Sequence, residues 1–422
     1  MTDELQLDIF VHQPIETNPA PIVIEPPKRK VYVLRDYQRE ASDAAVNFFN
    51  GKLGKGNALI VCPTGSGKSL IVADIASRLD GKLLVFQPSK EILEQNYEKY
   101  RSYGFYDCAV WSASMNSKKR ARVTFATIGS VMSNPEVFEE YKNIIVDECH
   151  LCNARGGRYK KFFEMGNRHI LGLTATPYRL VSYSMGCILK FLTRTKPRIF
   201  AKLIYQVPIQ KLMADGYLAK LRYFDMQLID VSNVRKNSTG QDYDEESLRK
   251  AYIAQDMNKK LVEVVNRLRT PKDGSKRHGI LVFTRFIDES EWLVSQLGDC
   301  AAIVTGETPK KERERVLKDF KSGKLEVVAN VGVLTTGFDY PELDTIVMAR
   351  PTMSLALWYQ CVGRGIRPSE GKNGWLVDMC GNVGRFGKVD DLTLTESSPG
   401  RGDWCVWGVV KNKWQQLTNI FF

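Results

Sequence analysis

The hydrophobic pattern of the chain consists of short apolar runs separated by longer amphipathic stretches. Within each run the apolar residues are continuous, which is typical of parallel strands buried on both faces. The first series of predicted strands comprises Ala58–Cys62, Leu83–Gln87, Val123–Ala126, Ile144–Asp147 and Ile170–Thr174. The second series comprises Ile280–Thr284, Ala301–Val304, Val327–Ala329, Thr345–Met348 and Trp375–Asp378.

The stretches between these runs predict the helices that cover the sheets. Ser69–Leu79 and Pro309–Phe320 are two examples, and Thr308 before Pro309 predicts a capped helix start with proline at its first position. The fold class is therefore α/β, with one parallel-sheet unit on each side of a less regular middle, residues 180–275. Within that middle, residues 246–268 predict a single helix.

Composition shifts suggest where the domains begin and end. Residues 1–32 contain five prolines and no periodicity, which predicts a flexible N-terminal arm. The first domain is expected over residues 33–205 and the second over residues 206–390. Residues 391–422 form a C-terminal extension that is rich in loop residues and then in aromatic ones.

The charge balance indicates which kind of partner to expect, and the cysteine content indicates the cellular compartment. The chain has 60 Lys and Arg against 48 Asp and Glu, a net charge of +12, which favours a polyanion and nucleic acid first. No apolar run is long enough to cross a bilayer, and the N-terminus lacks a signal-peptide pattern. Nine scattered cysteines indicate reduced thiols in the cytoplasm. Cys149 and Cys152 have no second ligand pair at zinc-site spacing, so no zinc site is expected.

The segment CPTGSGKS, which begins at Cys62, follows a predicted strand and precedes a predicted helix. Such a turn aims backbone N–H groups and a helix N-terminus at one anion. Cys62 stands where the strict phosphate-loop pattern has glycine. The residues predicted to bind nucleoside triphosphate are Thr64, Gly65, Ser66, Gly67, Lys68 and Ser69. Lys68 would reach the outer phosphates, and the Ser69 hydroxyl would ligate Mg²⁺.

A pair of acids, Asp147 and Glu148, follows the apolar residues of IIVDECH at the end of a predicted strand. Ligand sites of parallel sheets lie at such strand ends. Asp147 is expected to hold Mg²⁺ together with Ser69, and Glu148 to orient the attacking water. The expected cofactors are therefore ATP and Mg²⁺.

The order of the motifs resembles the DEAD/DEAH-type helicases of superfamily two. Besides the two motifs above, the similar stretches are LRDYQ, PSKEILEQ, ATIGS, LTATP, LVFTRF, TTGFD and QCVGRGIR, which together span residues 33–380. The resemblance implies two RecA-like parallel-sheet domains in tandem, with an ATP cleft between them. It also implies an ATP-dependent nucleic-acid helicase or translocase.

The chain looks most similar to RadD-type DNA-repair helicases and to phage-encoded branch-migration helicases. The similar stretches are DECH, LGLTATPYRL, VTGETPKKERERVLKDF, NVGVLTTGFD and QCVGRGIRPSEGK. RadD-type proteins are expected to carry a C-terminal zinc module, which has no cysteine cluster to match it here. The resemblance favours a monomer that unwinds or remodels branched or duplex DNA in repair, recombination or replication.

The resemblance also implies roles for single residues. Gln38 would read adenine, and Gly337 and Asp339 would contact the nucleotide from the second domain. Arg364 and Arg367 would act as arginine fingers, and their spacing of three would let a helix present both on one side. The implied coupling residues are His150, Thr174, Thr176 and Gln360. The implied nucleic-acid contacts are Ser89, Lys90, Thr127, Gly129, Ser130, Thr284, Arg285 and Thr335.

Two alternatives stay open at this point. The same motifs fit an RNA remodeller, and they fit a nucleic-acid clamp that binds ATP with little turnover. Three tryptophans of the C-terminal extension, Trp404, Trp407 and Trp414, lie near Lys411 and Lys413 and could stack on bases. We expect that the extension instead packs against one of the domains.

Overall fold

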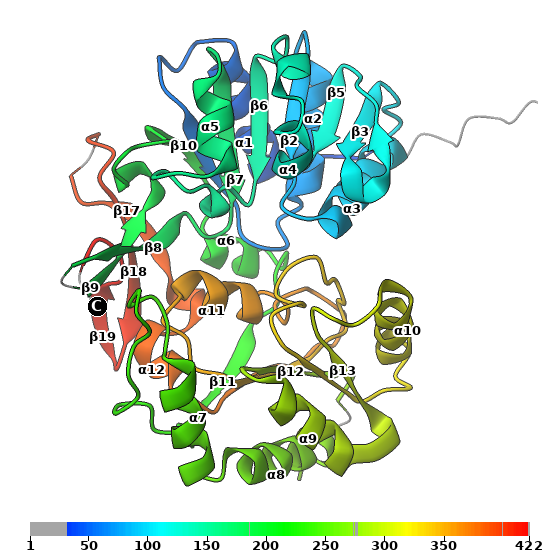
Figure 1. The fold of residues 1–422 in the computed structure, drawn as a ribbon, viewed down its shortest axis with the longest axis vertical. Helices are drawn as coiled ribbons and strands as arrows, with labels where there is room; N and C mark the ends of the chain where they lie inside the picture. Colours follow the sequence, from blue (N-terminus) through cyan, green and yellow to red (C-terminus); the bar gives the residue numbers. More distant parts are fainter. Residues whose placement is uncertain (1–31, 185, 273, 275–276, 399, 421–422) are drawn as a thin grey trace, which may run out of the picture.

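The computed structural model of the 422-residue chain describes residues 32–184, 186–272, 274, 277–398 and 400–420. The predicted N-terminal arm therefore lies outside the described residues, apart from Tyr32. Two α/β lobes are stacked in Figure 1, and the C-terminal strands lie along one flank beside both. Within the described part of the chain, no helix is long and apolar enough to cross a membrane.

The first lobe contains an eight-stranded sheet, parallel except for its last strand. In spatial order its strands are β10 (Lys202–Gln206), β1 (Ala58–Val61), β7 (His169–Thr174), β6 (Asn143–Asp147), β2 (Leu83–Phe86), β5 (Val123–Ala126), β3 (Cys108–Ser112) and β4 (Ser117–Lys118). The helices of this lobe are α1 (Asp36–Phe49), α2 (Lys68–Arg78), α3 (Lys90–Ser102), α4 (Ile128–Val131) and α5 (Arg158–Glu164). The carboxyl ends of β1, β2, β5 and β6 carry the predicted motifs to one edge.

The second lobe contains a six-stranded parallel sheet. In spatial order its strands are β11 (Leu221–Asp225), β16 (Gly374–Asp378), β15 (Thr345–Ala349), β12 (Ile280–Thr284), β14 (Val327–Asn330) and β13 (Ala301–Val304). Its helices are α7 (Glu245–Ala254), α8 (Met257–Arg269), α9 (Ile287–Leu297), α10 (Lys310–Lys321), α11 (Leu355–Val362) and α12 (Asn382–Phe386). All ten predicted strands are confirmed, with ends that differ by at most one residue.

Smaller elements join and flank the lobes. A hairpin of β8 (Tyr178–Tyr183) and β9 (Gly186–Phe191) follows β7, and α6 (Ile209–Ala214) connects the lobes. The C-terminal sheet consists of the antiparallel strands β17 (Thr393–Glu396), β18 (Trp404–Val410) and β19 (Lys413–Gln416). Short 3₁₀ helices span Ala113–Met115, Pro135–Phe138, Cys149–Leu151, Leu192–Arg194, Gly298–Cys300 and Val389–Asp391.

Both faces of the second sheet are buried, as continuous apolar runs require. Leu281 and Phe283 of β12 belong to one hydrophobic cluster, whereas Ile280 and Val282 point into another. Burying one such side chain stabilises the fold by roughly 1.5–3 kcal/mol, so leaving either face open would be costly. The first of these clusters continues into the first lobe and the C-terminal sheet, which ties the three parts together.

The middle of the chain is more regular than its sequence predicts. It contributes β10 to the first sheet, β11 to the second and the β8–β9 hairpin. The single helix predicted over 246–268 is wrong: α7 and α8 are separated at Asp256, whose left-handed φ of 53° redirects the chain. The cap predicted at Thr308 is also wrong, because α10 begins after Pro309 and the Thr308 hydroxyl accepts from Thr305 N at 2.9 Å.

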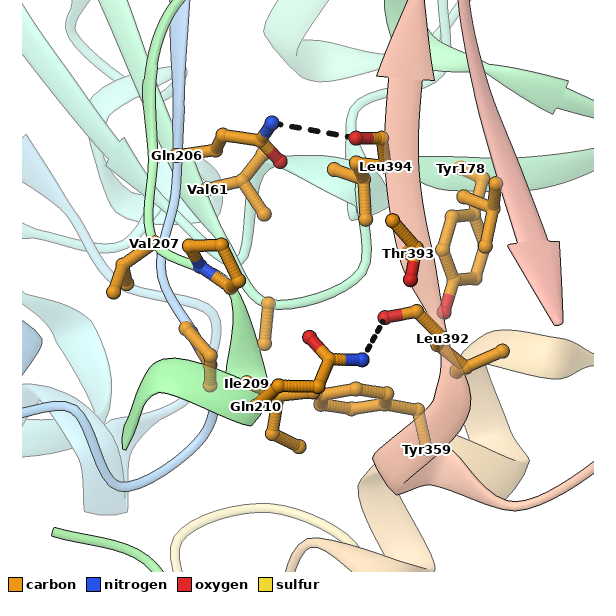
Figure 2. A pocket seen from close by; sticks show the side chains of 14 residues that line it. Val61, Tyr178, Gln206, Val207, Ile209, Gln210, Tyr359, Leu392, Thr393 and Leu394 are labelled. Carbon is orange, nitrogen blue, oxygen red and sulfur yellow. Dashed lines mark hydrogen bonds between the residues drawn. The ribbon is translucent and has the colours of Figure 1, made fainter. Parts of the chain in front are cut away.

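A cavity where the lobes meet the C-terminal sheet is drawn in Figure 2. Gln206 Nε2 donates to the carbonyl oxygen of Leu394 at 3.4 Å, and Gln210 Nε2 donates to that of Leu392 at 3.0 Å. Tyr359 of α11 lines the same cavity from the second lobe. The extension thus packs against both lobes, whereas the sequence predicts packing against one.

Candidate nucleotide site and nucleic-acid surface

The predicted phosphate loop connects β1 to α2 through two left-handed glycines. Gly65 has φ 91° and Gly67 has φ 79°, a region that favours glycine. A Cβ at Gly65 would lie 2.7 Å from Nη1 of Arg367, and one at Gly67 would lie 2.5 Å from Nε2 of Gln38. A side chain at either position would therefore need Arg367 or Gln38 to move, and the positive φ would strain any residue other than glycine.

Two neighbouring side chains of α1 hold this loop in place. The hydroxyl of Tyr37 and the amide nitrogen of Gln38 each donate to the carbonyl oxygen of Ser66 at 2.8 Å. The Gln38 oxygen accepts from Arg35 N at 3.0 Å. Both ends of the Gln38 amide are thus bonded within the protein, and adenine reading by Gln38 stays a prediction. Sequence reasoning missed Tyr37, although LRDYQ places it beside Gln38.

Opposite charges face each other across the loop. Lys68 Nζ lies 3.9 Å from Oε1 of Glu148. Burial opposes ionisation of Glu148, but Lys68 and His150 outweigh it and lower the pKa of this carboxyl to about 2. Burial, followed by repulsion from Glu148, raises the pKa of Asp147 to about 6. Glu148 is consequently ionised at neutral pH, and Asp147 is a carboxylate that a nearby cation would stabilise.

A side chain that sequence reasoning missed joins the two predicted magnesium ligands. Asn96 Oδ1 accepts from the Ser69 hydroxyl at 2.5 Å, and Asn96 Nδ2 lies 3.5 Å from Oδ2 of Asp147. Hydroxyl and carboxylate oxygens are the donors that Mg²⁺ prefers, so Ser69 and Asp147 fit such an ion. Asn96 lies one residue beyond PSKEILEQ, on the face of α3 that is turned toward the loop.

These groups line a cleft of about 530 Å³ to which both lobes contribute. The predicted residues that line it are Thr64, Gly65, Gly67, Lys68, Ser69, Asp147, Glu148, Gly337, Asp339, Arg364 and Arg367. Gln95 of α3 crosses the cleft and donates to the carbonyl oxygen of Gly337 at 3.2 Å. The cleft is therefore assembled from motifs that are far apart in sequence.

The two arginines contact acceptors of their own lobe. Arg364 is buried, and its guanidinium donates to the carbonyl oxygens of Phe338 at 2.7 Å and Gln360 at 3.3 Å. Burial, together with repulsion from Arg367, lowers the pKa of Arg364 to about 10. Arg367 Nε lies 3.2 Å from Oδ1 of Asp339 without hydrogen-bond geometry. Both side chains line the cleft, but neither is bonded to the phosphate loop.

The presentation of these arginines by a helix is wrong. Helix α11 ends at Val362, Arg364 lies in the turn that follows, and Arg367 lies in the loop after that turn. The turn packs closely on β15, because a Cβ at Gly365 would lie 2.9 Å from Cδ1 of Ile346. Lys372, which ends the stretch QCVGRGIRPSEGK but had no predicted role, donates to the Arg367 carbonyl oxygen at 2.7 Å and holds this segment in place.

The four predicted coupling residues form one hydrogen-bonded network. His150 Nδ1 lies 3.0 Å from the Thr174 hydroxyl and 3.1 Å from the Thr176 hydroxyl. On the opposite ring edge, His150 Nε2 lies 3.1 Å from Nε2 of Gln360, which belongs to the second lobe. With the Gln360 amide donating to Nε2, the imidazole proton is on Nδ1, 3.3 Å from Glu148 Oε2.

In the first lobe, the predicted nucleic-acid contacts lie at helix starts. Ser89 caps α3, with its hydroxyl accepting from Ile92 N at 3.4 Å, and Lys90 begins that helix. The Thr127 hydroxyl, before α4, donates to Ser130 Oγ at 3.0 Å. Gly129 lies in α4 and is approached by the side chain of Arg158. These residues share one edge of the sheet, and their hydroxyls have partners within the lobe.

The predicted contacts of the second lobe are less accessible. Thr284 is fully buried, and its hydroxyl contacts Ser290 Oγ at 2.6 Å, so that hydroxyl does not reach a surface. Thr335 is also buried. Arg285 is paired with Asp242 at 3.5 Å and with Glu245 at 3.0 Å. A strand that binds Arg285 must therefore displace these acids.

The cysteine pair near the acids is buried. Burial raises the pKa of both Cys149 and Cys152, and both cysteines are free thiols. Over residues 32–420, excluding the undescribed positions, no three His, Cys, Asp or Glu side chains gather as metal ligands. The absence of a zinc site stays a prediction.

Comparison with known proteins identifies a family model for each of the two lobes. The model of the type III restriction enzyme res subunit matches residues 31–179, and that of the helicase conserved C-terminal domain matches residues 258–369. A 51.5 kDa protein of Lactococcus phage (isolate 7-9) is 26% identical over 337 residues, 79% of this chain and 67% of the relative. IRC3 of Saccharomyces cerevisiae, a candidate ATP-dependent helicase, is 24% identical over 393 residues, 86% of this chain and 53% of the relative.

Among solved structures, the ATP-dependent type ISP restriction-modification enzyme LlaBIII, bound to DNA, has a similar fold. Its TM-score is 0.62 at 19% identity, over 83% of this chain and 28% of the enzyme. The chain thus spans about half to two thirds of the length of the two curated relatives. With both domains present in this order around a shared cleft, the chain belongs to the DEAD/DEAH-type helicases of superfamily two.

Proposed function

We propose that this protein is an ATP- and Mg²⁺-dependent helicase or translocase that unwinds or remodels branched or duplex DNA in repair, recombination or replication. The observation that carries the proposal is the shared cleft, in which Lys68 and Glu148 of one lobe face Arg364 and Arg367 of the other. A nucleotide in this cleft would contact both lobes. Its hydrolysis would change the contacts between them.

The first lobe binds the triphosphate in this proposal. Backbone N–H groups of the phosphate loop and the ammonium group of Lys68 hold the phosphates. Glu148, which its low pKa keeps ionised, orients the attacking water. Mg²⁺, when bound by Ser69 and Asp147, neutralises charge on the phosphates. Gln38 contributes to the part of the site that binds the adenine base.

The second lobe completes the site when the lobes close. Arg364 and Arg367 exchange their present acceptors for phosphoryl oxygens, while Gly337 and Asp339 contact the nucleotide. An arginine finger raises turnover by roughly 10³–10⁵ in well-studied GTPases. The bond between Gln360 and His150 is well placed to couple the state of Glu148 to the second lobe.

Nucleic acid is the proposed substrate on which the protein acts, with DNA favoured over RNA. The net charge of +12 suits a phosphate backbone. The first lobe matches a restriction-enzyme model, which favours DNA. The proposed contacts with the phosphate backbone lie at helix starts in the first lobe and at Arg285 in the second. Contacts to phosphates suit binding without sequence preference. We further propose action as a monomer in the cytoplasm.

We infer domain boundaries near residues 205 and 390. The support is that β10, which ends at Gln206, pairs with β1 of the first sheet, whereas β11, which starts at Leu221, pairs with β16 of the second. The C-terminal strands β17–β19 pair only with one another among the described strands. Limited proteolysis between Val207 and Lys220 would test the first boundary.

The test is the substitution Glu148→Gln in the full chain. We expect ATP binding to persist while DNA-stimulated hydrolysis falls by at least about a hundredfold, because the amide cannot orient water as a carboxylate does. Unchanged hydrolysis would refute the role of Glu148. Assays with matched single-stranded, forked and four-way DNA and RNA would show the preferred substrate. Tight ATP-dependent binding with negligible wild-type turnover would instead favour the clamp.

A further inference from the structure

Two basic segments of the chain, residues 154–161 and 193–202, meet at a second cavity between the lobes. This cavity, the lobe-junction pocket, has a volume of about 190 Å³. Its cations are Arg155, Arg179 and Lys196, and its polar side chains include Asn153, Ser182 and Gln241. None of the described residues lines both this pocket and the nucleotide cleft, so the two are separate sites.

The walls of the lobe-junction pocket come from both lobes. Ser182 belongs to β8, and its carbonyl oxygen accepts from Nη1 of Arg155 in the first lobe at 3.1 Å. Its hydroxyl accepts from Nε2 of Gln241 at 2.9 Å, and Gln241 lies in the second-lobe loop between β11 and α7. Figure 1 shows β8 and β9 on the flank where the lobes meet. A ligand in this pocket would therefore lie against both lobes.

The positive charge of the lobe-junction pocket is not neutralised locally. No Asp or Glu is among the described residues that line it. Within the described ranges, none of the ion pairs involves Arg155, Arg179 or Lys196, and no hydrogen bond reaches the exposed ammonium group of Lys196. Burial, together with repulsion from Arg155, lowers the pKa of Arg179. An anion bound among these three cations would relieve that repulsion.

The position of the pocket indicates which anion it would bind. On the first-lobe side Arg158, three residues after Arg155, approaches the predicted contact Gly129, and its Nη1 lies 3.1 Å from a Cβ placed there. On the second-lobe side Gln241 precedes Asp242, which is paired with the predicted contact Arg285. A strand that reaches from Gly129 to Arg285 would pass this pocket.

The donors of the pocket suit a phosphate group. Guanidinium groups donate to phosphate oxygens in pairs, and an ammonium group adds a point charge. The volume is several times the ~30 Å³ that a water molecule occupies in the liquid, which leaves room for such a group. An acidic peptide would satisfy the same cations, but nothing would place it between two predicted nucleic-acid contacts.

We propose that the lobe-junction pocket binds one backbone phosphate of a nucleic-acid strand through Arg155, Arg179 and Lys196, with Gln241 contributing from the second lobe. The inference rests on the proposed nucleic-acid function, to which it adds a contact that none of the predicted nucleic-acid residues supplies. Because the bound phosphate would contact both lobes, a movement of one lobe against the other would change how tightly the strand is held.

The experiment compares two probes, an oligothymidylate of about 20 nucleotides and an abasic strand of equal length, which exceed the ~4–16-nucleotide footprints usual for such proteins. We expect Arg155→Gln with Lys196→Gln in the full chain to weaken binding of both probes by about tenfold. The slope of log affinity against log salt should fall by about 1, as for the loss of one phosphate contact. The two probes should lose equally, because they carry the same phosphates. Lys196→Gln alone, which leaves the bond between Arg155 and Ser182 in place, should weaken both by a few-fold.

The control is Lys259→Gln with Arg267→Gln, which removes the same charges from exposed positions of α8 outside the pocket. Its probe affinities and salt slope should equal those of the wild type. Basal ATP hydrolysis without nucleic acid should be unchanged in all these variants, because none of the substituted residues lines the nucleotide cleft.

The outcomes separate the pocket from the proposed function. If the wild type binds both probes and the pocket variant binds them as tightly, only the pocket is refuted. A loss confined to oligothymidylate would indicate a base contact and overturn the phosphate assignment. If inorganic phosphate alone binds the wild type more tightly than the pocket variant while the probes do not distinguish them, the pocket binds a free anion and the proposal is wrong. If the wild type binds neither probe, both the pocket and the proposed function are refuted.

Discussion

The two lobes have the same type of sheet, yet their functional side chains are arranged differently. In the first lobe they bond to one another: Tyr37 and Gln38 hold the phosphate loop, and Asn96 joins Ser69 to Asp147. In the second lobe, by contrast, Arg364 and Arg285 are bound to carbonyl oxygens or acids of the same lobe. The first lobe is therefore preorganised for a ligand, whereas the second must exchange partners to take part.

The largest expected effect separates ATP binding from turnover. Arg367→Ala should lower DNA-stimulated hydrolysis by about a thousandfold, because a finger acts mainly in the transition state, and should change ATP affinity by only a few-fold. Lys68→Ala should weaken both ATP binding and hydrolysis. Titration with a fluorescent ATP analogue and single-turnover kinetics would measure the two effects.

Arg315→Ala is the control, because Arg315 is exposed on α10 of the same lobe and does not line the cleft. It should behave as the wild type does. If Arg367→Ala lowered ATP affinity as much as Lys68→Ala does, both lobes would bind ATP in the ground state. The contrast between a preorganised first lobe and a second lobe that must exchange its hydrogen-bond partners would then be wrong.

The next effect concerns two glutamates whose pKa values shift in opposite directions. Burial raises the pKa of Glu289 in the second lobe to about 7, from 4.5, whereas the pKa of Glu148 is lowered. Glu289 is protonated more readily in the folded state, so the stability it contributes falls as pH rises from about 4.5 to about 7 and is level above. We expect a decrease of about 2 kcal/mol in the free energy of unfolding across this window.

Glu289→Gln should remove most of that dependence, because the amide oxygen can still accept from Phe286 N, now bonded at 2.8 Å. Thermal unfolding midpoints at pH 5.5 and pH 8 would measure the difference between the two proteins. Equal pH slopes in wild type and variant would show that the protonation of Glu289 does not affect stability.

A smaller effect is expected at the bond between the lobes. Gln360→Ala removes the partner of His150 Nε2 without touching the phosphate loop. We expect the ratio of DNA-stimulated to basal hydrolysis to fall by about tenfold, since allosteric coupling between sites is typically worth ~1–3 kcal/mol. Gln210→Ala, which removes an amide contact to the C-terminal sheet instead, is the comparison. An equal loss in both variants would indicate a general weakening of the interface.

The smallest expected effect concerns Arg285. Asp242→Asn combined with Glu245→Gln should strengthen DNA binding by about two- to fivefold, because partly exposed ion pairs are each worth no more than about 1 kcal/mol. Glu246→Gln, which removes an exposed acid of the same helix paired with Lys250, should have no such effect. Weaker DNA binding in the double variant would mean that Asp242 and Glu245 contribute to DNA binding instead of competing with it. Fluorescence anisotropy at fixed ionic strength would provide the measurement.

Most of the fold and much of the candidate site could be predicted from the sequence, for local reasons. Apolar runs such as Ile280–Thr284 identify buried strands because both of their faces must be covered. The spacing of Gly65, Gly67 and Lys68 identifies the phosphate loop because backbone geometry and charge act within a few residues. Edge strands such as β10 and β11 carry weaker patterns, since one of their sides lacks a neighbouring strand.

The sequence by itself determined which residue types are available at each strand end: an ammonium group, two carboxylates, hydroxyls and guanidinium groups in a given order. Only the tertiary structure decided which of these meet. The approach of Asn96 to Asp147 and the pairing of Arg285 with Asp242 both depend on segments that are distant in the chain. Such contacts depend on how whole helices and strands pack against one another. A pattern of neighbouring residues does not contain this information.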